Sequence, residues 1–370
     1  MKIVNVTTET LRHRWGDTTR DSVIVKIESD NGLIGISRGG DIDVISKVFS
    51  PILIGEDPRN IMKLWYLMYD EIWKYRKIKL NELIGSWKDV MQLSISLGAV
   101  DIALWDLYGK YIEEPVWRIL GGFSDEVKVY ADGIGYLDQT VEEVVQIFKS
   151  HSDQGYEYIK YHITEPNVDE AVEKLLLSNQ LINSKNKNVS TKFMLDAFSM
   201  WSMDQAKEYI DKTSEAPLYF LEEIVKKDNE YGNYIKLKQY TNTKIAGGES
   251  TVNIFQAKQL LDTHSIDILQ TDILGGGGFT GLKSISELAK SYGAILMPHG
   301  AQYPELNSHL VASISNGDMI PACPESEPYQ IWSMLYDVKP NIINGVMKLN
   351  TNPGLGLDFN NEFINTNKIM

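Results

Sequence analysis

The sequence predicts an α/β protein in which a (β/α)8-type barrel follows an N-terminal α+β domain. The first 120 or so residues form strands and then helices, an order that is typical of an α+β unit. From residue 127 onward, eight short apolar strands alternate with amphipathic helical segments. Strands that are apolar on both faces are typical of a buried parallel sheet. Eight such units over about 200 residues therefore favour a closed barrel over an open doubly wound sheet.

The N-terminal α+β domain is predicted from strands followed by two helices. Residues 2–8 and 23–29 are rich in β-branched side chains, and Asn31-Gly32 forms a hairpin turn before a third short strand. Apolar residues at three- and four-residue intervals predict a helix over 61–72. A second helix is predicted over 94–111, with apolar side chains on more than one face.

The eight barrel strands are separated by helical segments of similar length. We predict these strands at 127–133, 156–163, 192–198, 219–224, 244–249, 268–273, 294–300 and 318–325. Neither GxGxxG nor GxxxxGK[ST] follows any of them, which argues against a nucleotide-binding fold. We therefore predict an N-terminal domain at 1–122, a barrel domain at 123–335, and a C-terminal segment at 336–370 that returns to the N-terminal domain.

Composition and charge restrict the classes of function. The chain of 370 residues carries 36 basic and 50 acidic side chains, a net charge of −14, whereas a nucleic-acid groove needs a basic surface. We therefore expect no nucleic-acid partner, and the same charge argues against binding to an anionic membrane surface. The one cysteine, Cys323, excludes an internal disulfide framework and a four-cysteine zinc site. It is typical of a reducing compartment.

No segment has the pattern of a targeting or membrane-spanning sequence. The first ten residues lack the apolar stretch of a signal peptide. The apolar segment at 94–105 contains Asp101 and is shorter than the roughly 18 residues of a membrane span. We therefore expect a cytoplasmic protein with no membrane partner, and we expect it to form a homo-oligomer.

Polar residues lie near the C-terminal ends of six predicted barrel strands, where a barrel builds its active site. Neighbours in this series are 23 to 27 positions apart, about one β-α unit, and the six are Asp196, Glu222, Glu249, Asp272, His299 and Glu325. An acid at a single strand end is usually only a surface residue. The regular spacing of the series predicts that its members face one mouth of the barrel.

Three consecutive members of the series are carboxylates: Asp196, Glu222 and Glu249. Three crowded anions would raise their own pKa values unless a positive charge lay between them. A hard divalent cation with oxygen ligands meets this need, and an incomplete protein shell suits Mg²⁺ better than Ca²⁺. The sequence therefore predicts a magnesium site.

Several motifs identify a family when they are taken together. FLEEI, AGGES, LQTDILGGGGFTG and MPHG occur at successive strand ends, while the segment 96–122 and PGLGL near residue 355 flank the barrel. The sequence resembles the enolase superfamily, within its mandelate racemase-like subgroup. The resemblance implies that the N-terminal domain caps the barrel and that the C-terminal tail completes this capping domain. It also implies that Asp196, Glu222 and Glu249 bind Mg²⁺, with Glu222 rather than Glu223 as the second ligand.

The Asp272 and His299 positions match the family's catalytic dyad. A carboxylate that accepts a hydrogen bond from one ring nitrogen fixes the tautomer of histidine and raises the basicity of the other nitrogen. The resemblance therefore implies that His299 transfers protons and that Asp272 orients it. The other histidines away from strand ends, such as His264 and His309, are expected to be structural.

Strand two departs from the family pattern. Many members have Lys-x-Lys there with the second lysine as base, whereas this sequence has Lys160-x-His162. The two side chains share one face because strand side chains alternate, and a lysine inside an apolar barrel needs an anionic partner. His162 is either a base or a hydrogen-bond donor to the substrate.

The residue on strand eight is not fixed by the pattern. The family places a carboxylic acid there that donates a hydrogen bond to the substrate carboxylate, and the proline-flanked PACPES segment leaves Glu325 or Glu327 in that role. A solvated loop acid is the alternative. Cys323 is expected to be buried rather than nucleophilic, since no histidine adjoins it in sequence. The glycine run 275–278 is expected to allow close packing rather than to form a phosphate nest.

Basic residues lie in the interval between the first two predicted strands. They are Arg12, Arg14 and Arg20, together with Trp15. The resemblance implies that the corresponding loop closes over the barrel and selects the substrate, and arginines there would suit an acidic, polyhydroxylated ligand. A solvated loop is the alternative.

These residues together predict abstraction of the proton α to a carboxylate, because a divalent cation can neutralise the enediolate that results. The expected reaction is dehydration of a small-molecule sugar acid, an aldonate, to a 2-keto-3-deoxy acid, since the resemblance implies that members with this dyad are mostly acid-sugar dehydratases. The residues expected to take part are His299, Asp272, Lys160, His162 and Glu325.

Three other functions remain open. A racemase or epimerase would need a base on each face of the substrate, and Lys160 with His162 keeps this open. A muconate-type cycloisomerase is disfavoured, because LQTDILGGGG lacks the lysine that this subgroup uses on strand six. A non-catalytic member of the family would show a magnesium-dependent thermal shift without turnover of any acid sugar.

Overall fold

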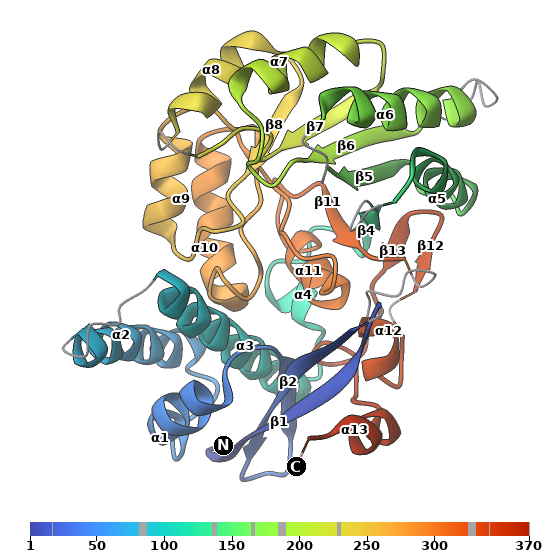
Figure 1. The fold of residues 1–370 in the computed structure, drawn as a ribbon. Helices are drawn as coiled ribbons and strands as arrows, with labels where there is room; N and C mark the ends of the chain where they lie inside the picture. The colour runs from blue at the N-terminus through green and yellow to red at the C-terminus, as the bar shows by residue number, and fades with distance from the viewer. Residues whose placement is uncertain are drawn as a thin grey trace.

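The computed structural model describes nine stretches of the chain. They are 1–16, 18–80, 87–134, 139–163, 167–183, 190–227, 231–324, 331–339 and 341–369. Within them an N-terminal α+β domain packs against a barrel, and both chain ends lie on the side of the N-terminal domain (Figure 1). The predicted fold class is confirmed.

The N-terminal domain begins with an antiparallel sheet. Its strands β1 (Ile3–Trp15), β2 (Thr18–Ser29) and β3 (Ile34–Arg38) pair in sequence order. The predicted turn at Asn31-Gly32 joins β2 to β3, and Gly32 has the positive φ of 82° that such a turn favours.

The first hairpin is longer than the sequence predicts. Residues 9–15 and 18–22, expected to belong to a loop, continue the β1–β2 ladder to the end of both strands. Cross-strand contacts account for this: Arg12 donates two hydrogen bonds to Asp21, at 2.7 and 2.8 Å, and the Arg20 guanidinium lies 4.1 Å from the ring centroid of Trp15. Opposite charges and cation–π pairs across a ladder stabilise it. The expected loop arginines are therefore strand residues with partners.

Helices make up the rest of the N-terminal domain. They are η1 (Val44–Phe49), α1 (Ser50–Leu53), α2 (Ile61–Leu80), α3 (Trp87–Ile112) and α4 (Val116–Ile119). The helix α3 contacts β2, β3 and α2. Its segment Val90–Ile112 is long and apolar enough to cross a membrane, but 78% of the apolar window is buried inside the protein. This segment is therefore the core helix of the domain.

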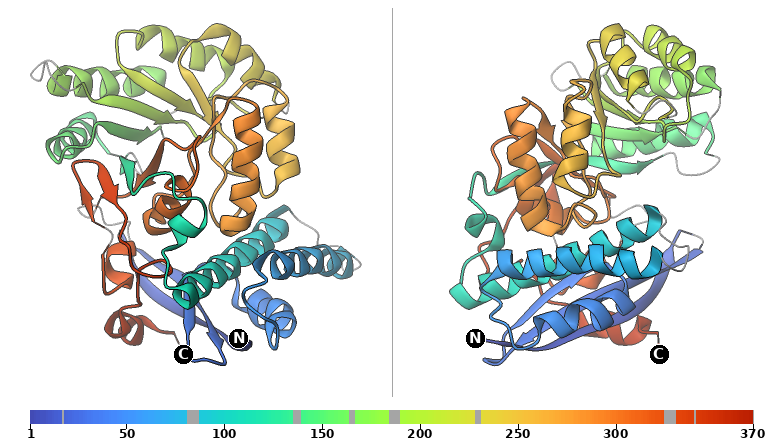
Figure 2. Two further views of the ribbon diagram at one scale, coloured as in Figure 1. Left: turned by 180° about the vertical axis from the view of Figure 1, so that it is seen from behind. Right: turned by 90° about the vertical axis from the view of Figure 1, so that its left-hand side faces the viewer.

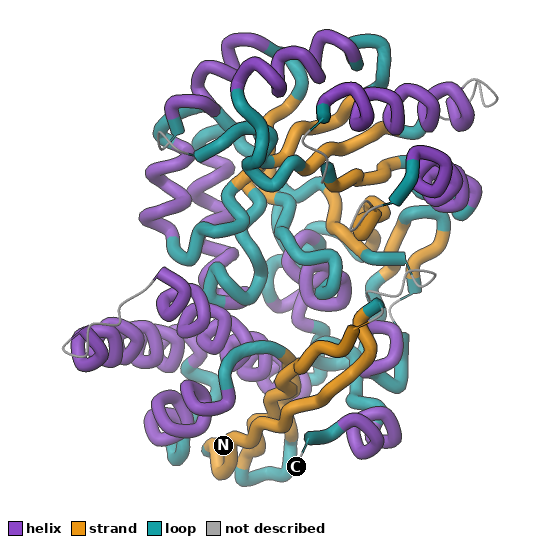
Figure 3. The backbone as a smooth tube through the Cα atoms, in the orientation of Figure 1, coloured by secondary structure: helices purple, strands orange, loops and turns teal. Residues whose placement is uncertain are grey.

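The barrel is a ring of parallel strands. Its members are β4 (Glu126–Ile134), β5 (Tyr158–His162), β6 (Lys192–Asp196), β7 (Leu218–Glu222), β8 (Lys244–Gly247), β9 (Ile268–Leu269), β10 (Ile295–Leu296) and β11 (Met319–Ala322). Each strand from β5 to β10 pairs with its predecessor, and β11 pairs with β4. A bridge between Leu296 and Gly317 closes the remaining gap. The tube drawing shows the barrel strands side by side, away from the sheet of the N-terminal domain (Figure 3).

Helices surround the ring on its outside (Figure 2). They are α5 (Val141–Asp153), α6 (Val168–Asn183), α7 (Met203–Lys212), α8 (Gly232–Tyr240), α9 (Ile254–Leu261), α10 (Gly278–Ser291) and α11 (Pro304–Val311). Inside the ring, a separate buried cluster contains Tyr130, Met194, Phe220, Ala246, Ile268, Met297 and Met319. Because these side chains fill the barrel, polar groups can gather only at its rim.

The C-terminal tail rejoins both parts of the molecule. Its elements are α12 (Trp332–Leu335), β12 (Ile342–Ile343), β13 (Val346–Lys348) and α13 (Asn361–Asn367). The strand β13 pairs antiparallel with the start of β4. Further on, the N–H of Leu355 donates to Asp106 of α3 at 2.7 Å, and the N–H of Ile369 donates to the carbonyl of Thr10 at 2.9 Å. The tail thus completes the N-terminal domain, as predicted.

Glycines bring α3 against the barrel at the junction before α10. A Cβ at Gly98 would lie 2.3 Å from the carbonyl oxygen of Leu274, and a Cβ at Gly278 would lie 2.4 Å from Oδ2 of Asp101. No side chain fits at these distances. The glycine run 275–278 therefore serves close packing, as expected.

His309 joins three separate segments of the fold. Its Nδ1 accepts a hydrogen bond from the N–H of Trp117 at 3.1 Å, and its Nε2 donates to the carbonyl of Leu355 at 3.1 Å. The imidazole must be neutral to make both bonds, because Nδ1 is an acceptor. Burial lowers the pKa of His309 to about 4, although the hydrogen bond to Leu355 opposes this shift. The structural role expected for this histidine is confirmed.

We expect His309 to make folding stability depend on pH. Its pKa is lower in the folded protein than in the unfolded chain, so its contribution is complete above pH 6.5 and is lost as the pH falls toward 4. This loss amounts to about 3 kcal/mol, at 1.36 kcal/mol per pKa unit. Glutamine can accept and donate the same two bonds but does not titrate, so His309→Gln should remove this part of the pH dependence. Denaturant unfolding of both proteins between pH 4 and 8 tests this, and parallel curves would contradict it.

Candidate active site

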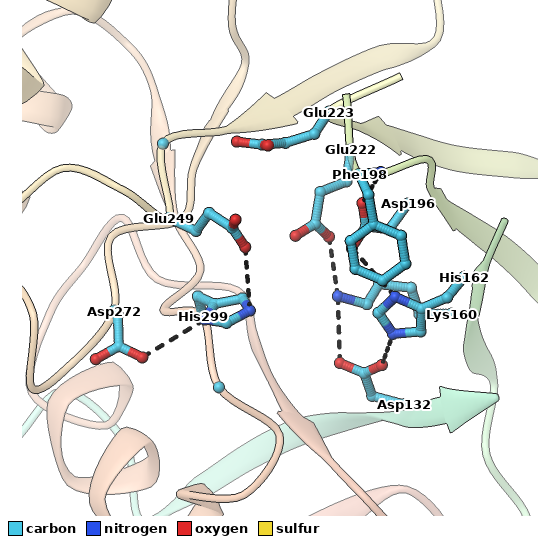
Figure 4. Close-up of polar contacts among 12 residues, drawn as sticks. Asp132, Lys160, His162, Asp196, Phe198, Glu222, Glu223, Glu249, Asp272 and His299 are labelled. Atoms are coloured by element: carbon cyan, nitrogen blue, oxygen red, sulfur yellow. Dashed lines mark hydrogen bonds and ion pairs between the residues drawn. The ribbon is translucent and has the colours of Figure 1, made fainter. Parts of the chain in front are cut away.

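The C-terminal rim of the barrel brings the predicted site residues together (Figure 4). His162 of β5 lies opposite Asp196 of β6, which in turn lies opposite Glu222 of β7. Residues in register on neighbouring parallel strands lie at the same height, so these three form a row. The segments that follow β8, β9 and β10 supply the other three described residues: Glu249, Asp272 and His299.

The predicted metal ligands do not all point to the same place. One ligand atom each from Glu222, Glu249 and His299 lies within 4.8 Å of the others. Asp196 is next to Glu222 in register, but its Oδ2 lies 3.2 Å from Nδ1 of His162. The structure therefore brings two of the three carboxylates together with His299, and directs the third carboxylate toward β5.

His299 lies between two carboxylates. Its Nδ1 is 3.5 Å from Oδ2 of Asp272, and its Nε2 is 3.3 Å from Oε2 of Glu249. Burial favours the neutral ring, but the hydrogen bond to Asp272 and the charge of Glu249 outweigh it and raise the pKa of His299 to about 9. The N–H groups of Leu274 and Gly275 each donate to Oδ1 of Asp272 at 2.8 Å, which holds this carboxylate beside the ring.

Lys160 and His162 point into the rim from β5, and both contact the carboxylate of Asp132. Oδ1 of Asp132, on β4, lies 2.6 Å from Nε2 of His162, and its Oδ2 lies 3.2 Å from Nζ of Lys160. Lys160 also donates to Oε2 of Glu222 at 3.0 Å. The anionic partner that a buried lysine requires is thus a pair of carboxylates. Both ring nitrogens of His162 face carboxylates, from Asp132 and Asp196.

These contacts shift the pKa values in opposite directions. Burial acts against the charged forms of Lys160 and His162, but the neighbouring carboxylates outweigh it, raising the pKa of Lys160 well above its usual value and that of His162 to about 9. The pKa of Asp132 is lowered, because Lys160 and His162 outweigh its burial. Burial is the main reason that the pKa of Glu222 rises to about 7; the charge of Asp196 adds to the rise and Lys160 opposes it.

The two neighbouring glutamates at the end of β7 have different surroundings. Glu222 faces Lys160 in the rim, whereas Glu223 accepts a hydrogen bond from Ser199 at 3.0 Å and pairs with Lys227. Glu223 also has a positive φ of 42°, which turns the chain out of the strand. Glu222, and not Glu223, therefore belongs to the row of side chains at the rim.

Asp132 also lies at the rim, although it is not a member of the predicted strand-end series. It lies near the C-terminal end of the first barrel strand, about one β-α unit before Lys160 and His162, so the same spacing rule could have found it. Glu325 and Glu327 lie outside the described residues. Cys323 is buried, as expected.

Family comparisons agree with this geometry over most of the chain. Residues 5–121 match the family model for the mandelate racemase / muconate lactonizing enzyme N-terminal domain. Residues 142–363 match the model for the enolase C-terminal domain-like family. The chain therefore belongs to the mandelate racemase / muconate lactonizing enzyme family of the enolase superfamily.

Solved structures of several activities resemble the chain. The 3,6-anhydro-D-galactonate cycloisomerase from Zobellia galactanivorans is 26% identical, with all of both chains covered and a TM-score of 0.85. A racemase from Streptomyces coelicolor A3(2) with bound magnesium is 21% identical over 99% of this chain and 100% of its own, with a TM-score of 0.85. A putative dehydratase from Mesorhizobium loti is 22% identical over 100% and 99%, with a TM-score of 0.83. The last two show the shared fold.

Proposed function

We propose that the protein is a magnesium-dependent enzyme that removes the proton α to the carboxylate of a sugar acid and expels the β-hydroxyl. The product of this dehydration is a 2-keto-3-deoxy acid. The observation that carries the proposal is the position of His299, which Asp272 orients beside the carboxylates of Glu249 and Glu222.

The donor set fits Mg²⁺. Glu222 and Glu249 bring carboxylate oxygens close together, and Asp196 adds a carboxylate opposite Glu222 on the neighbouring strand; these are the ligands that this cation prefers. The raised pKa of Glu222 reflects burial and the nearby Asp196 charge, and a cation between these groups would relieve that repulsion. When bound, Mg²⁺ would act as a Lewis acid toward the enediolate oxygens. The structure of the S. coelicolor racemase contains bound magnesium, which supports Mg²⁺ as the cofactor of this protein.

His299 is the group best placed to move protons. Asp272 accepts from Nδ1, so Nε2 is the nitrogen that exchanges a proton with the substrate. This nitrogen can take the α-proton and then deliver a proton to the departing hydroxyl, which needs acid help because hydroxide is a poor leaving group. One histidine can do both when the proton and the hydroxyl leave from the same face.

The opposite face of the site favours elimination over racemisation. Racemisation needs a proton-transfer group on each face of the substrate. Lys160 is held in its ammonium form by Asp132 and Glu222, and each ring nitrogen of His162 faces a carboxylate. His299 also lies between two carboxylates, but its side chain is 32% exposed, whereas those of Lys160 and His162 are 1% and 2% exposed. This burial leaves the β5 side suited to binding and charge balance rather than to exchanging a proton with the substrate.

Cycloisomerisation is a second candidate, favoured by the 26% identity over the full length to an anhydro-galactonate cycloisomerase. In a 3,6-anhydro sugar acid, a ring ether oxygen replaces the β-hydroxyl. The same α-proton abstraction would then open the ring, and no water would be lost. The two candidate reactions therefore share the site and differ in the leaving group.

A panel of aldonates and anhydro-aldonates, incubated with enzyme and Mg²⁺, tests the proposal. We expect a 2-keto acid product that has lost one water relative to its substrate, as measured by carbonyl derivatisation and mass spectrometry. A 2-keto product of unchanged mass from an anhydro-aldonate would instead support cycloisomerisation. Deuterium incorporation at the α-carbon in D₂O, without any keto product, would contradict both candidates and support a racemase.

A further inference from the structure

Five side chains at the rim form one continuous chain of charged contacts. From one end to the other, they are Asp196, His162, Asp132, Lys160 and Glu222. The successive distances are 3.2 Å, 2.6 Å, 3.2 Å and 3.0 Å. Figure 4 shows these contacts, with Asp132 beneath the two cations. The two ends of the chain are proposed metal ligands, and its centre is a residue with no assigned role.

The whole chain is buried. The exposed fraction of its side chains runs from 0% for Glu222 to 5% for Asp132. Breaking one ion pair in such a place leaves a buried charge without a partner, which is strongly unfavourable. The contacts therefore fix the positions of these groups. Phe198 limits the His162 ring further, since the two rings stack at a centroid distance of 5.1 Å and an angle of 18°.

Asp132 is the one member that contacts both cations. Its Oδ1 faces His162 and its Oδ2 faces Lys160, so a single carboxylate fixes the ring and the ammonium group together. The other face of each cation meets a proposed metal ligand: His162 meets Asp196, and Lys160 meets Glu222. A displacement of Asp132 would therefore change the positions of two proposed metal ligands together.

We propose that Asp132 is a positioning residue of the magnesium site. It acts through His162 on Asp196 and through Lys160 on Glu222, and it touches neither the metal nor the substrate. The inference rests on the proposed function, because it takes Asp196 and Glu222 as ligands. Partners that orient metal ligands in this way typically contribute 10- to 100-fold to metal affinity.

The role of His162 follows from the same contacts. The ring lies between two carboxylates, with Nε2 at 2.6 Å from Oδ1 of Asp132 and Nδ1 at 3.2 Å from Oδ2 of Asp196. In this arrangement His162 links Asp132 to a proposed metal ligand, and an imidazole with nitrogens on two sides of its ring suits this position better than the second lysine of the family pattern. A lysine has a single nitrogen at the end of a flexible chain. It could not hold two carboxylates on opposite sides of one rigid group, as the imidazole ring does.

The test measures magnesium binding to the metal-free full-length protein by isothermal titration, without any substrate. We expect Asp132→Asn to weaken the Kd for Mg²⁺ by about 10- to 100-fold. Asp318→Asn is the matched control, because Asp318 precedes β11 at the opposite end of the barrel, where it bonds to Tyr219. It removes the same charge and should leave the Kd within about twofold of the wild type, which separates positioning from the overall charge of the protein.

A second variant and a double variant complete the test. His162→Asn should weaken Mg²⁺ binding to a similar extent, and it replaces Asp132→Asn if that variant does not fold. Asp132→Asn should have a smaller effect when His162→Asn is already present, because the first acts partly through the second. An unchanged Kd in folded Asp132→Asn or His162→Asn, or fully additive effects, would overturn the inference. If the wild type itself binds no Mg²⁺, the proposed function fails as well.

Discussion

Replacing His299 with asparagine should reduce kcat for sugar-acid elimination by about 10²- to 10⁴-fold or more, the range typical of a lost general acid or base. The side chain is the proton carrier whether His299 acts as acid alone or as both acid and base. Its backbone would stay in place, since Asn307 donates to the carbonyl oxygens of His299 and Gly300, at 3.4 and 3.1 Å. Steady-state kinetics and a thermal melt measure the two effects separately.

The exposed His264 offers a matched control for this variant. It has a positive φ of 50°, a conformation that asparagine tolerates well. His264→Asn should therefore keep wild-type turnover. Wild-type-like turnover by His299→Asn would overturn the assignment, and the acid would have to be sought in the N-terminal domain or at Glu325.

Glu249→Gln should abolish turnover and weaken the binding of Mg²⁺ while the fold survives. Glutamine keeps the shape of the side chain but removes the negative charge that attracts the cation. The Glu249 side chain is 36% exposed, so little packing depends on it. Isothermal titration with Mg²⁺, thermal melts and kinetics on the same preparations test the three parts of this expectation.

Glu223→Gln is the corresponding control at a neighbouring carboxylate. Glu223 bonds to Ser199 and Lys227 rather than facing the row at the rim. We expect the magnesium affinity of the Glu223→Gln variant to stay close to that of the wild type. Full activity of chelator-treated wild-type enzyme with no detectable metal would contradict the magnesium assignment altogether.

The heights of the site residues could be predicted from the sequence, because one β-α unit repeats at nearly constant length. Asp196 and Glu222 lie opposite each other on neighbouring strands, as their 26-residue separation predicts. The choice between Glu222 and Glu223 came from the family resemblance, because the predicted strand 219–224 contains both residues, whereas β7 ends at Glu222. The repeat length determines the height of each residue along its strand and its order around the barrel. The predicted heights of the site residues depend only on these two properties.

The directions of the side chains could not be predicted in the same way. Asp196 faces His162 because that ring is fixed in turn by Asp132, and no spacing rule contains a contact of this kind. The short ladders of β9 and β10 are another example. The predicted strands at 268–273 and 294–300 each keep only two residues in the ladder, because their polar ends bend into the segments that carry the site.

The hairpin β1–β2 shows the limit of composition as a guide to loops. The interval 9–22 is polar enough to suggest a solvated segment, yet residues 9–15 pair with residues of β2 across the ladder. Pairs such as Arg12 with Asp21 add to the stability of a ladder without any apolar alternation. Such partners are recognisable only once the register is known.

The hydrogen bond between Ile369 and Thr10 has a consequence for how the chain folds during synthesis. The strand β1 leaves the ribosome early, but its partner near residue 369 follows only after all eight barrel strands have been made. The N-terminal domain therefore lacks its contact with the C-terminal tail while the barrel is being synthesised. Contacts of such large sequence separation slow folding and favour intermediates with exposed apolar surface. A nascent chain stopped before residue 336 should therefore bind chaperones more strongly than the finished protein does.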